Sequence, residues 1–451
     1  MRARIFLWCS LLAVSPLVAC GSDSGAPAVA FAPPDLQDSG PASVDAGGGS
    51  LPEVDSGGAM DDSKPRGKDA GKGSDSAPVD AGPFTTAAHP PFPLLVRGSA
   101  SGGVLSAPVI VPVFFPGYDH TTEVKDQLST MGTVGTYWHD AVSEYGVGAF
   151  TYGTPVDLTE AAPASIGHTG IVTWLKGKLS GSHPGFPTPT AQTMYVLYYP
   201  STTNLQGSCS DPATGGGGYG GYHDALQTSG GTTVAYGVIA ECANFGSVPS
   251  TLDMVTVAGS HEIIEAVTDA QPGNGFASLD ARGFALDIFL QGNEENGDLC
   301  AVSHAFLRPA SYPYLLSRGW SNKAAAAGNQ DPCQPALPDQ PYIGAAPVMP
   351  DTISAAGSSG PGIVIPIGQS KTVDVELWSS GPTAPFTVAA KQARGDTTLS
   401  FSWDKTTGVN GDHLKLTITA NSTKAGGYET FVIVSKLNDE QRPIWAGVVK
   451  N

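Results

Sequence analysis

The chain has 451 residues, and its 41 acidic against 23 basic side chains give a formal net charge of −18. An acidic chain with so few Lys and Arg residues lacks the positive surface that nucleic acids require, so nucleic-acid binding is excluded. Beyond the N-terminal segment there is no apolar run of about 18 residues, which argues against a polytopic membrane protein. The length allows two or three domains.

The N-terminal segment has the arrangement of a secretory signal. Arg2 and Arg4 precede an apolar run from Ile5 to Ala19, and the run ends in Leu-Val-Ala-Cys20, which resembles the lipobox of bacterial lipoproteins. We predict a signal peptide at 1–19 and a lipid anchor on Cys20. The alternative is an ordinary signal peptide with an unrelated cysteine, which would give a secreted protein. We expect the bacterial cell envelope, with a preference for the outer membrane.

Residues 20–88 are dominated by Gly, Ser, Ala, Pro and Asp, and loose echoes of a Val-Asp-(Ala/Ser)-Gly unit recur through them. Such a composition buries too little apolar surface to offset the entropy of ordering. We therefore predict a disordered stalk that holds the rest of the chain away from the membrane.

Four cysteines remain after the signal peptide and the lipidated residue, namely Cys209, Cys242, Cys300 and Cys333. An even number in an exported protein indicates disulfides, and four cysteines allow three pairings. We predict the nearest-neighbour pairs Cys209–Cys242 and Cys300–Cys333, each worth about 3–4 kcal/mol. A four-cysteine zinc site is disfavoured because no C-x-x-C spacing occurs.

Residues 89–343 alternate between strand and helix patterns, which is typical of an α/β or α+β domain. Apolar spacing predicts two helices early in this region and a third that begins at the N-cap residue Ser250 and ends near Asp269. The predicted order of elements is similar to that of the N-terminal lobe of zincin metallopeptidases. The predicted elements are strands at 104–115, 149–158, 194–199 and 234–240, and helices at 124–145, 171–179 and 251–269.

Residues 344–451 lack helical periodicity and contain about seven short strands separated by Gly, Pro and Asn. This pattern predicts an all-β, Ig-like sandwich as an accessory domain. Trp378, Trp403 and Trp445 are either core residues or an aromatic platform for a polysaccharide.

The segment Ser260-His-Glu-Ile-Ile-Glu-Ala-Val-Thr-Asp269 carries the candidate chemistry. His261 and Glu265 are separated by one helical turn, so they project from one face, as the two histidines of H-E-x-x-H do when they bind a metal. Glu262 is placed to act as the general base. The pair suits Zn²⁺, with Ca²⁺ or Mn²⁺ as alternatives because a carboxylate replaces the second histidine.

A zinc site needs a third protein ligand. We expect it among His223, which follows a glycine-rich loop, Asp269, two turns along the helix, and the acidic residues Glu295 and Asp298. Glu294 and His304 are further candidates. The alternative for the helix is a polar cluster without a metal, and for the acidic segment it is a solvated turn.

Taken together, the SHEIIEAVTD helix, the later GDLC segment and Trp320-Ser-Asn322 before Cys333 resemble the EXORDIUM (phosphate-induced) family, over about residues 91–333. The resemblance implies an extracellular protein in which His261, Glu262, Glu265, His223, Asp298 and the four cysteines are the functional or framework positions.

Two functions follow as hypotheses. The first is a surface-anchored zinc-dependent peptidase that hydrolyses peptide bonds with metal-activated water and Glu262 as base. The second is a non-catalytic extracytoplasmic binding protein on a zincin-like scaffold, with a protein or polysaccharide of the cell surface as its partner.

Overall fold

The computed structural model describes residues 83–98, 102–181, 183, 185–209, 219–243, 248–290, 294–301, 306–338, 340–395, 398–422, 427–438 and 440–451. The predicted signal peptide, the lipidation site Cys20 and nearly all of the predicted stalk lie outside these residues. Within them the fold is mixed α+β and richer in strand than in helix. None of the helices in this described part has the length and apolar composition needed to cross a membrane.

The helices belong to the first two thirds of the described chain. They are α1 (Thr121–Met131), α2 (Tyr137–Val142), α3 (His168–Leu179), α4 (Thr251–Thr268), α5 (Phe284–Leu290), α6 (Asn296–Ala301) and α7 (Asn322–Ala327). The predicted helix at 124–145 is wrong as a single element, since it is divided into α1 and α2. Gly132 and Gly135 lie at the break, and Gly135 has a φ of +52°, which is left-handed and incompatible with a continuing helix.

A mixed sheet forms the centre of the first lobe. Its strands are β2 (Val109–Phe114), β3 (Thr151–Tyr152), β4 (Val156–Asp157), β6 (Thr193–Tyr198), β8 (Gly221–Gln227) and β9 (Thr233–Ile239). The order is β3-β2-β6-β9-β8, with β4 also paired to β2. All neighbours are parallel except β8 and β9, so β8 is an antiparallel edge strand. The sequence did not predict β8, because its residues follow a glycine-rich loop and lack strict alternation.

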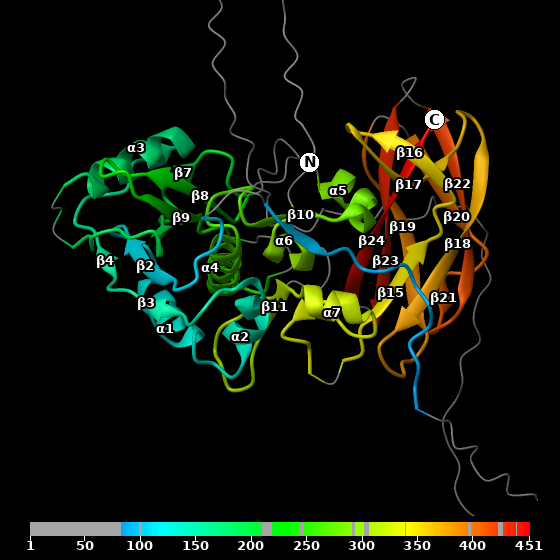
Figure 1. Cartoon of the computed structure of the whole chain (residues 1–451), viewed down its shortest axis with the longest axis horizontal. Coiled ribbons are helices and arrows are strands. Elements are labelled where there is room, and N and C mark those ends of the chain that lie inside the picture. The colour runs from blue at the N-terminus through cyan, green and yellow to red at the C-terminus, as the bar shows by residue number, and fades with distance from the viewer. Residues whose placement is uncertain are drawn as a thin grey trace, which may run out of the picture.

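The second lobe is built from two sheets (Figure 1). One has the order β15-β18-β22-β20 and the other β16-β17-β24-β23-β19-β21. Their strands are β15 (Ile343–Pro347), β16 (Asp351–Ala355), β17 (Ser358–Val364), β18 (Ser370–Ser379), β19 (Phe386–Gly395), β20 (Thr398–Trp403), β21 (Thr407–Gly408), β22 (His413–Ser422), β23 (Tyr428–Leu437) and β24 (Glu440–Lys450). Side chains from both sheets share one core, which confirms the all-β character expected of this region.

The remaining described strands form small two-stranded sheets. Their strands are β1 (Leu95–Arg97) with β10 (Phe276–Leu279), β5 (Ser165–Ile166) with β7 (Asn204–Leu205), β11 (Phe306–Leu307) with β12 (Leu316–Ser317), and β13 (Gly319–Trp320) with β14 (Cys333–Gln334). Two disulfides, Cys209–Cys242 and Cys300–Cys333, join segments 33 residues apart, with Cα–Cα distances of 5.4 and 5.7 Å. The predicted pairing is confirmed. These disulfides are compatible with an oxidising, extracytoplasmic compartment.

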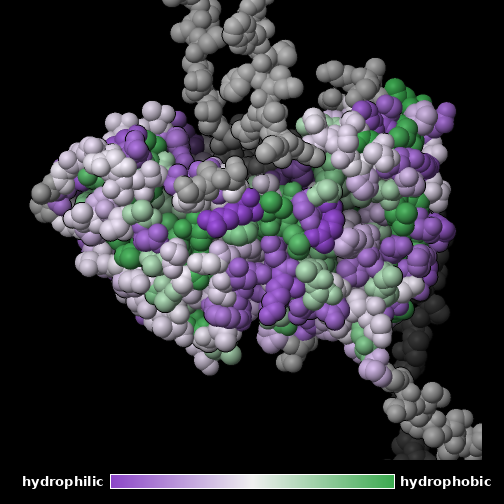
Figure 2. All heavy atoms as spheres, viewed as in Figure 1, coloured by the Kyte–Doolittle hydropathy of each residue, from purple (hydrophilic) through white to green (hydrophobic). Residues whose placement is uncertain are grey.

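A hydrophobic cluster at the junction contains residues of both lobes. Helix α5 packs against strands of the six-stranded sheet, and Phe284 and Ile288 are buried together with Trp378 and Ile444. On the face shown in Figure 2, the coloured hydrophobic residues form small groups among hydrophilic ones. Trp378 is only 1% exposed and lies in this interface, so it cannot serve as part of a polysaccharide platform.

Residues 83–98, which we call the strap, run along the junction of the lobes. The backbone of Thr85 and Ala87, at the end of the predicted stalk, bonds to the Asn410 side chain of the second lobe. Farther along, Leu95 exchanges two hydrogen bonds of 2.8 Å with the Asn322 side chain of the first lobe. The strap is therefore hydrogen-bonded to the second lobe near its start and to the first lobe near its end.

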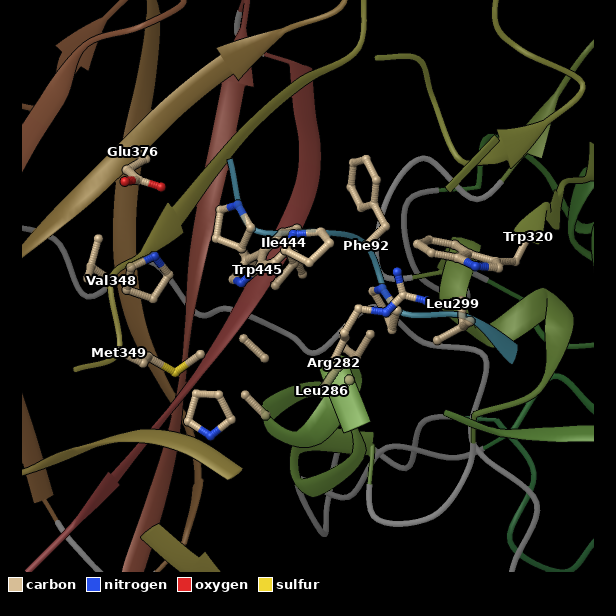
Figure 3. Close-up of a pocket in the computed structure, with 18 of the residues that line it drawn as sticks. Phe92, Arg282, Leu286, Leu299, Trp320, Val348, Met349, Glu376, Ile444 and Trp445 are labelled. Atoms are coloured by element: carbon tan, nitrogen blue, oxygen red, sulfur yellow. The ribbon is translucent and has the colours of Figure 1, made fainter. Parts of the chain in front are cut away.

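Phe92 of the strap lies at the centre of this junction. Its ring is surrounded by the aromatic rings of Trp320, Tyr342, Trp378 and Trp445, with centroids 5.7–6.3 Å away. A largely apolar cavity of about 360 Å³ lies beside it, and Figure 3 shows Phe92 and Ile444 on its wall. The strap thus contributes a core residue to an interface that the rest of the chain leaves incompletely filled.

We expect Phe92→Ala to lower the free energy of unfolding by about 3–5 kcal/mol, because it removes a buried ring. Calorimetry should also show the lobes unfolding less cooperatively. Phe84→Ala is the matched control, since Phe84 is 41% exposed. Equal stability of the two variants would contradict the role of the strap.

Candidate metal centre

Helix α4 positions the candidate site. It begins as predicted at Ser250, whose side chain accepts a hydrogen bond from the backbone of Asp253 at 3.1 Å. From Asp253 to its end every residue of the helix is buried, between β8 and β9 on one side and β12 and α6 on the other. Polar side chains on such a helix have no access to bulk water and need partners within the protein.

One candidate ligand group forms around His261. Its Nε2 atom lies 3.0 Å from Oε1 of Glu265 and 3.5 Å from Oδ1 of Asp298. The backbone amide of Asp298 donates to the same Glu265 oxygen at 3.0 Å. The donor atoms of the three residues all lie within 4.8 Å of one another, and their side chains are 2–3% exposed.

A second candidate ligand group forms around His223 on the edge strand β8. Its Nδ1 atom lies 3.7 Å from Oε2 of Glu265, and its Nε2 atom lies 3.6 Å from Oε1 of Glu295. The possible ligand atoms of His223, Glu265 and Glu295 also all lie within 4.8 Å of one another. Glu265 therefore belongs to both groups, which we call the His261 group (His261, Glu265, Asp298) and the His223 group (His223, Glu265, Glu295).

Hydrogen bonds hold both imidazole rings from outside the cluster. His223 Nε2 lies 3.1 Å from the backbone carbonyl of Asp269, to which it can only donate. His261 Nδ1 lies 3.3 Å from the Ser317 hydroxyl, which itself lies 3.4 Å from the carbonyl of Arg318. His261 thereby presents its other nitrogen to the carboxylates, which is the arrangement of metal-ligating histidines, whereas His223 has carboxylates near both of its nitrogens.

The charges of the cluster are strongly coupled. Burial by itself lowers the pKa of His223 and His261, but the facing carboxylates outweigh it and raise both pKa values well above the ordinary range. Burial raises the pKa of Glu295, and it raises that of Asp298 to about 7. For Glu265 the effect of burial is overcome by His261 and then His223, which lower its pKa to about 2. Glu265 is thus the carboxylate that its surroundings keep ionised.

Glu262, the predicted general base, lies next to the His223 group. Its Oε2 atom is 3.6 Å from His223 Nδ1, its side chain is 3% exposed, and burial raises its pKa. Gly221 at the start of β8 allows this position, because a Cβ there would lie 2.8 Å from Glu262 Cγ. The strand and the helix can approach closely only because a glycine lies between them.

The other predicted ligands have different surroundings. The Asp269 carboxylate accepts hydrogen bonds from the backbone of Gly273, Asn274 and Gly275, so it organises the loop after α4 and belongs to neither group. Glu294 is buried but also belongs to neither group. His304 lies outside the described residues. Of the four predicted third ligands, the structure brings His223, Glu295 and Asp298 to Glu265.

Two residues of the site carried no signal in the sequence. Ser317 on β12 orients His261, yet it lies 56 residues away along the chain. Gly297 lets the first turn of α6 approach α4, since a Cβ there would lie 2.6 Å from His261 Nδ1 and 2.8 Å from Glu265 Oε1. Neither role has a local pattern, because each depends on a contact between distant segments.

The residues present fit a bound cation. Each group offers an imidazole nitrogen and two carboxylates, which are ligands for Zn²⁺ or Mn²⁺. The Oδ2 atom of Asp298 is buried and has no hydrogen-bond partner among the residues that the structure describes. Ca²⁺ prefers six to eight oxygen ligands, so the histidine in each group argues against it.

Comparisons with known proteins do not extend this description. No family model matches the chain, and no curated protein is similar to it. A conjugate transposon protein from Bacteroides vulgatus is 13% identical over 26% of this chain and 91% of its own, with a TM-score of 0.16. An extracellular fragment of EsaA from Streptococcus gallolyticus is 22% identical over 18% of this chain and 22% of its own, with a TM-score of 0.12. The resemblance to the EXORDIUM family therefore stays a sequence-based expectation, and the function has to be argued from the site.

We expect Gly297→Ala to reduce the free energy of unfolding of the metal-free protein by about 1–3 kcal/mol, because the added methyl group overlaps His261 and Glu265. Gly177→Ala in α3 is the matched control, since nothing lies within 4 Å of its Cβ position. Urea unfolding of both variants measures the difference. Equal stabilities would show that the close contact of Gly297 with His261 and Glu265 does not limit the side chain at this position.

Proposed function

We propose that the protein is an exported zinc-dependent peptidase in which His261, Glu265 and Asp298 hold the metal. The observation that carries the proposal is the orientation of His261. Its Nδ1 atom is tied to Ser317, and its Nε2 atom points at two carboxylate oxygens, 3.0 and 3.5 Å away. In the neutral tautomer that donates to Ser317, this nitrogen presents a lone pair to anionic oxygens, an arrangement that a shared cation stabilises.

The architecture supports the choice of reaction class. The site-bearing helix α4 packs directly on β9 and on the antiparallel edge strand β8, after a run of alternating strands and helices. The order predicted from the sequence, which led to the comparison with the N-terminal lobe of zincins, lacked β8 and had one helix in place of α1 and α2. The zincin-like assignment is part of the proposal.

Glu262 is the residue that we assign to proton transfer. When bound, zinc would supply Lewis-acid polarisation of a peptide carbonyl and would lower the pKa of water. The Glu262 carboxylate, whose pKa burial raises, would accept a proton from the attacking water and pass it to the leaving amine. His223, 3.6 Å away, would hold that carboxylate in place and favour its ionised form.

The cellular setting belongs to the same proposal. The two disulfides support export to an oxidising compartment. We propose that Cys20 carries a lipid that anchors the chain to the outer membrane, and that the substrate is an extracytoplasmic protein. Labelling with a palmitate analogue, compared between the wild type and Cys20→Ala, tests the anchor.

A second function is favoured by the burial of the site. The side chains of His261, Glu262, Glu265 and Asp298 are at most 3% exposed. Closed sites of this kind are typical of structural metals. In this reading the metal stabilises a non-catalytic binding protein, whose partner is a protein or polysaccharide of the cell surface.

Elemental analysis of the purified protein after incubation with zinc tests the metal site. We expect at least one zinc per chain in the wild type and a clear loss in His261→Ala. His139→Ala is the control, because the His139 side chain is 78% exposed and remote from the cluster. Absence of zinc from the wild type would refute both readings.

Glu262→Gln separates the two readings. A peptidase should keep its metal and lose at least about 100-fold in the hydrolysis of a quenched-fluorescence peptide library, because the base is removed. Glu160→Gln, at an exposed residue that pairs with Lys178, should retain full activity. A wild type that binds zinc but cleaves no peptide would favour the structural role.

A further inference from the structure

We propose that the cluster holds two divalent cations, with Glu265 as the bridging ligand. One cation lies in the His261 group and the other in the His223 group. The inference rests on the proposed function for the first position, and it adds a second metal with its own ligands. It also makes His223 a metal ligand, whereas a single-metal site leaves it as a neighbour of Glu262.

The two oxygens of Glu265 face different groups. Oε1 lies 3.0 Å from His261 Nε2 and accepts the backbone amide of Asp298, also at 3.0 Å. Oε2 faces the other way along the cluster, 3.7 Å from His223 Nδ1. A carboxylate that presents one oxygen to each of two ligand groups is the arrangement of a bridging ligand.

Each group is completed by ligands of the same kind. Each contributes one imidazole and one further carboxylate, Asp298 in the His261 group and Glu295 in the His223 group. The carboxylates are three residues apart at the first turn of α6, where the Leu299 amide donates to the Glu295 carbonyl. Helix α6 and the residue before it therefore supply a terminal carboxylate to each side of Glu265.

The charge of the cluster also calls for two cations. Four carboxylates converge here, those of Glu262, Glu265, Glu295 and Asp298, and three of them are 3% exposed. When all four carboxylates are ionised and both histidines are neutral, a single divalent cation leaves two negative charges uncompensated in a buried site, which is costly. Two divalent cations balance the four carboxylates. Within the described part of the chain Oδ2 of Asp298 has no partner, which independently indicates a ligand in the His261 group.

The orientation of His223 supports the second position. Its Nε2 atom donates to the backbone carbonyl of Asp269 and also lies 3.6 Å from Oε1 of Glu295, while the neutral ring presents the Nδ1 lone pair to Glu262 and Glu265. Asp269 is itself fixed by three backbone amides, which makes this carbonyl a rigid anchor. The second position therefore also has a histidine held by a hydrogen bond to a residue outside its group. Paired metals of this kind stabilise both the attacking and the leaving group in hydrolysis.

The test is the zinc stoichiometry of the full chain, measured by elemental analysis after loading and gel filtration. We expect two zinc ions per chain in the wild type and one in His223→Ala. His168→Ala should retain two, because His168 is 52% exposed and lies outside both groups, although it also contacts β8 through Asp224. Loading with Mn²⁺ adds a spectroscopic measurement, since a bridged pair gives a spin-coupled electron paramagnetic resonance signal that His223→Ala should abolish.

Glu295→Gln is a second test in case His223→Ala does not fold. The Glu295 side chain is 21% exposed, so it tolerates replacement more readily than the buried His223. This variant too should bind one zinc while its circular dichroism matches the wild type. One zinc in both the wild type and these variants would overturn the second site and leave the proposed function intact. Two zinc ions in every variant would overturn the ligand assignment, and none in the wild type would overturn the proposed function as well.

Discussion

The structure depends on the compensation of buried charge around Glu265. This side chain lies on a helix with no exposed face, and it contacts two histidines and the backbone of α6. Every neighbouring element is arranged around it: β8 supplies His223, β12 supplies Ser317, and the first turn of α6 supplies Asp298. Gly221 and Gly297 permit the close approaches that this convergence requires. A buried polar cluster of this density is stable only when each charge is matched, which explains why segments far apart in sequence meet at one helix.

The second structural constraint is the shared core between the lobes. Helix α5 and the strap lie between the first lobe and the sheet that contains β17, β23 and β24. The C-terminal lobe is therefore packed against the first lobe and is not joined to it by a linker alone. Trp378 is buried in this junction and stacks on His89 of the strap, with centroids 4.5 Å apart. The C-terminal lobe therefore packs against the segments that follow α4, including the disulfide-linked region that carries Asp298.

Local patterns in the sequence predicted much of this framework. The Ser250 N-cap, the buried helix and the all-β character of the last hundred residues follow from local patterns and appear in the structure. The nearest-neighbour choice among the three possible cysteine pairings is also confirmed. The failures occurred where tertiary contacts override local preference. The predicted long helix divides at Gly132 and Gly135, and the unpredicted strand β8 forms because β9 and α4 provide its partners. Asp269 was a candidate ligand two turns along the helix, but its carboxylate accepts hydrogen bonds from backbone amides of the following loop.

The sequence by itself determined which residues of α4 share a face, because the spacing of His261 and Glu265 is a property of any α-helix. It also limited the third ligand to a few acidic or histidine side chains. Only the tertiary structure decided among them, since it places His223 and Glu295 on one side of Glu265 and His261 and Asp298 on the other. The reason is physical: helix periodicity is encoded within a few residues, whereas the position of an edge strand or a short helix depends on the packing of the whole lobe.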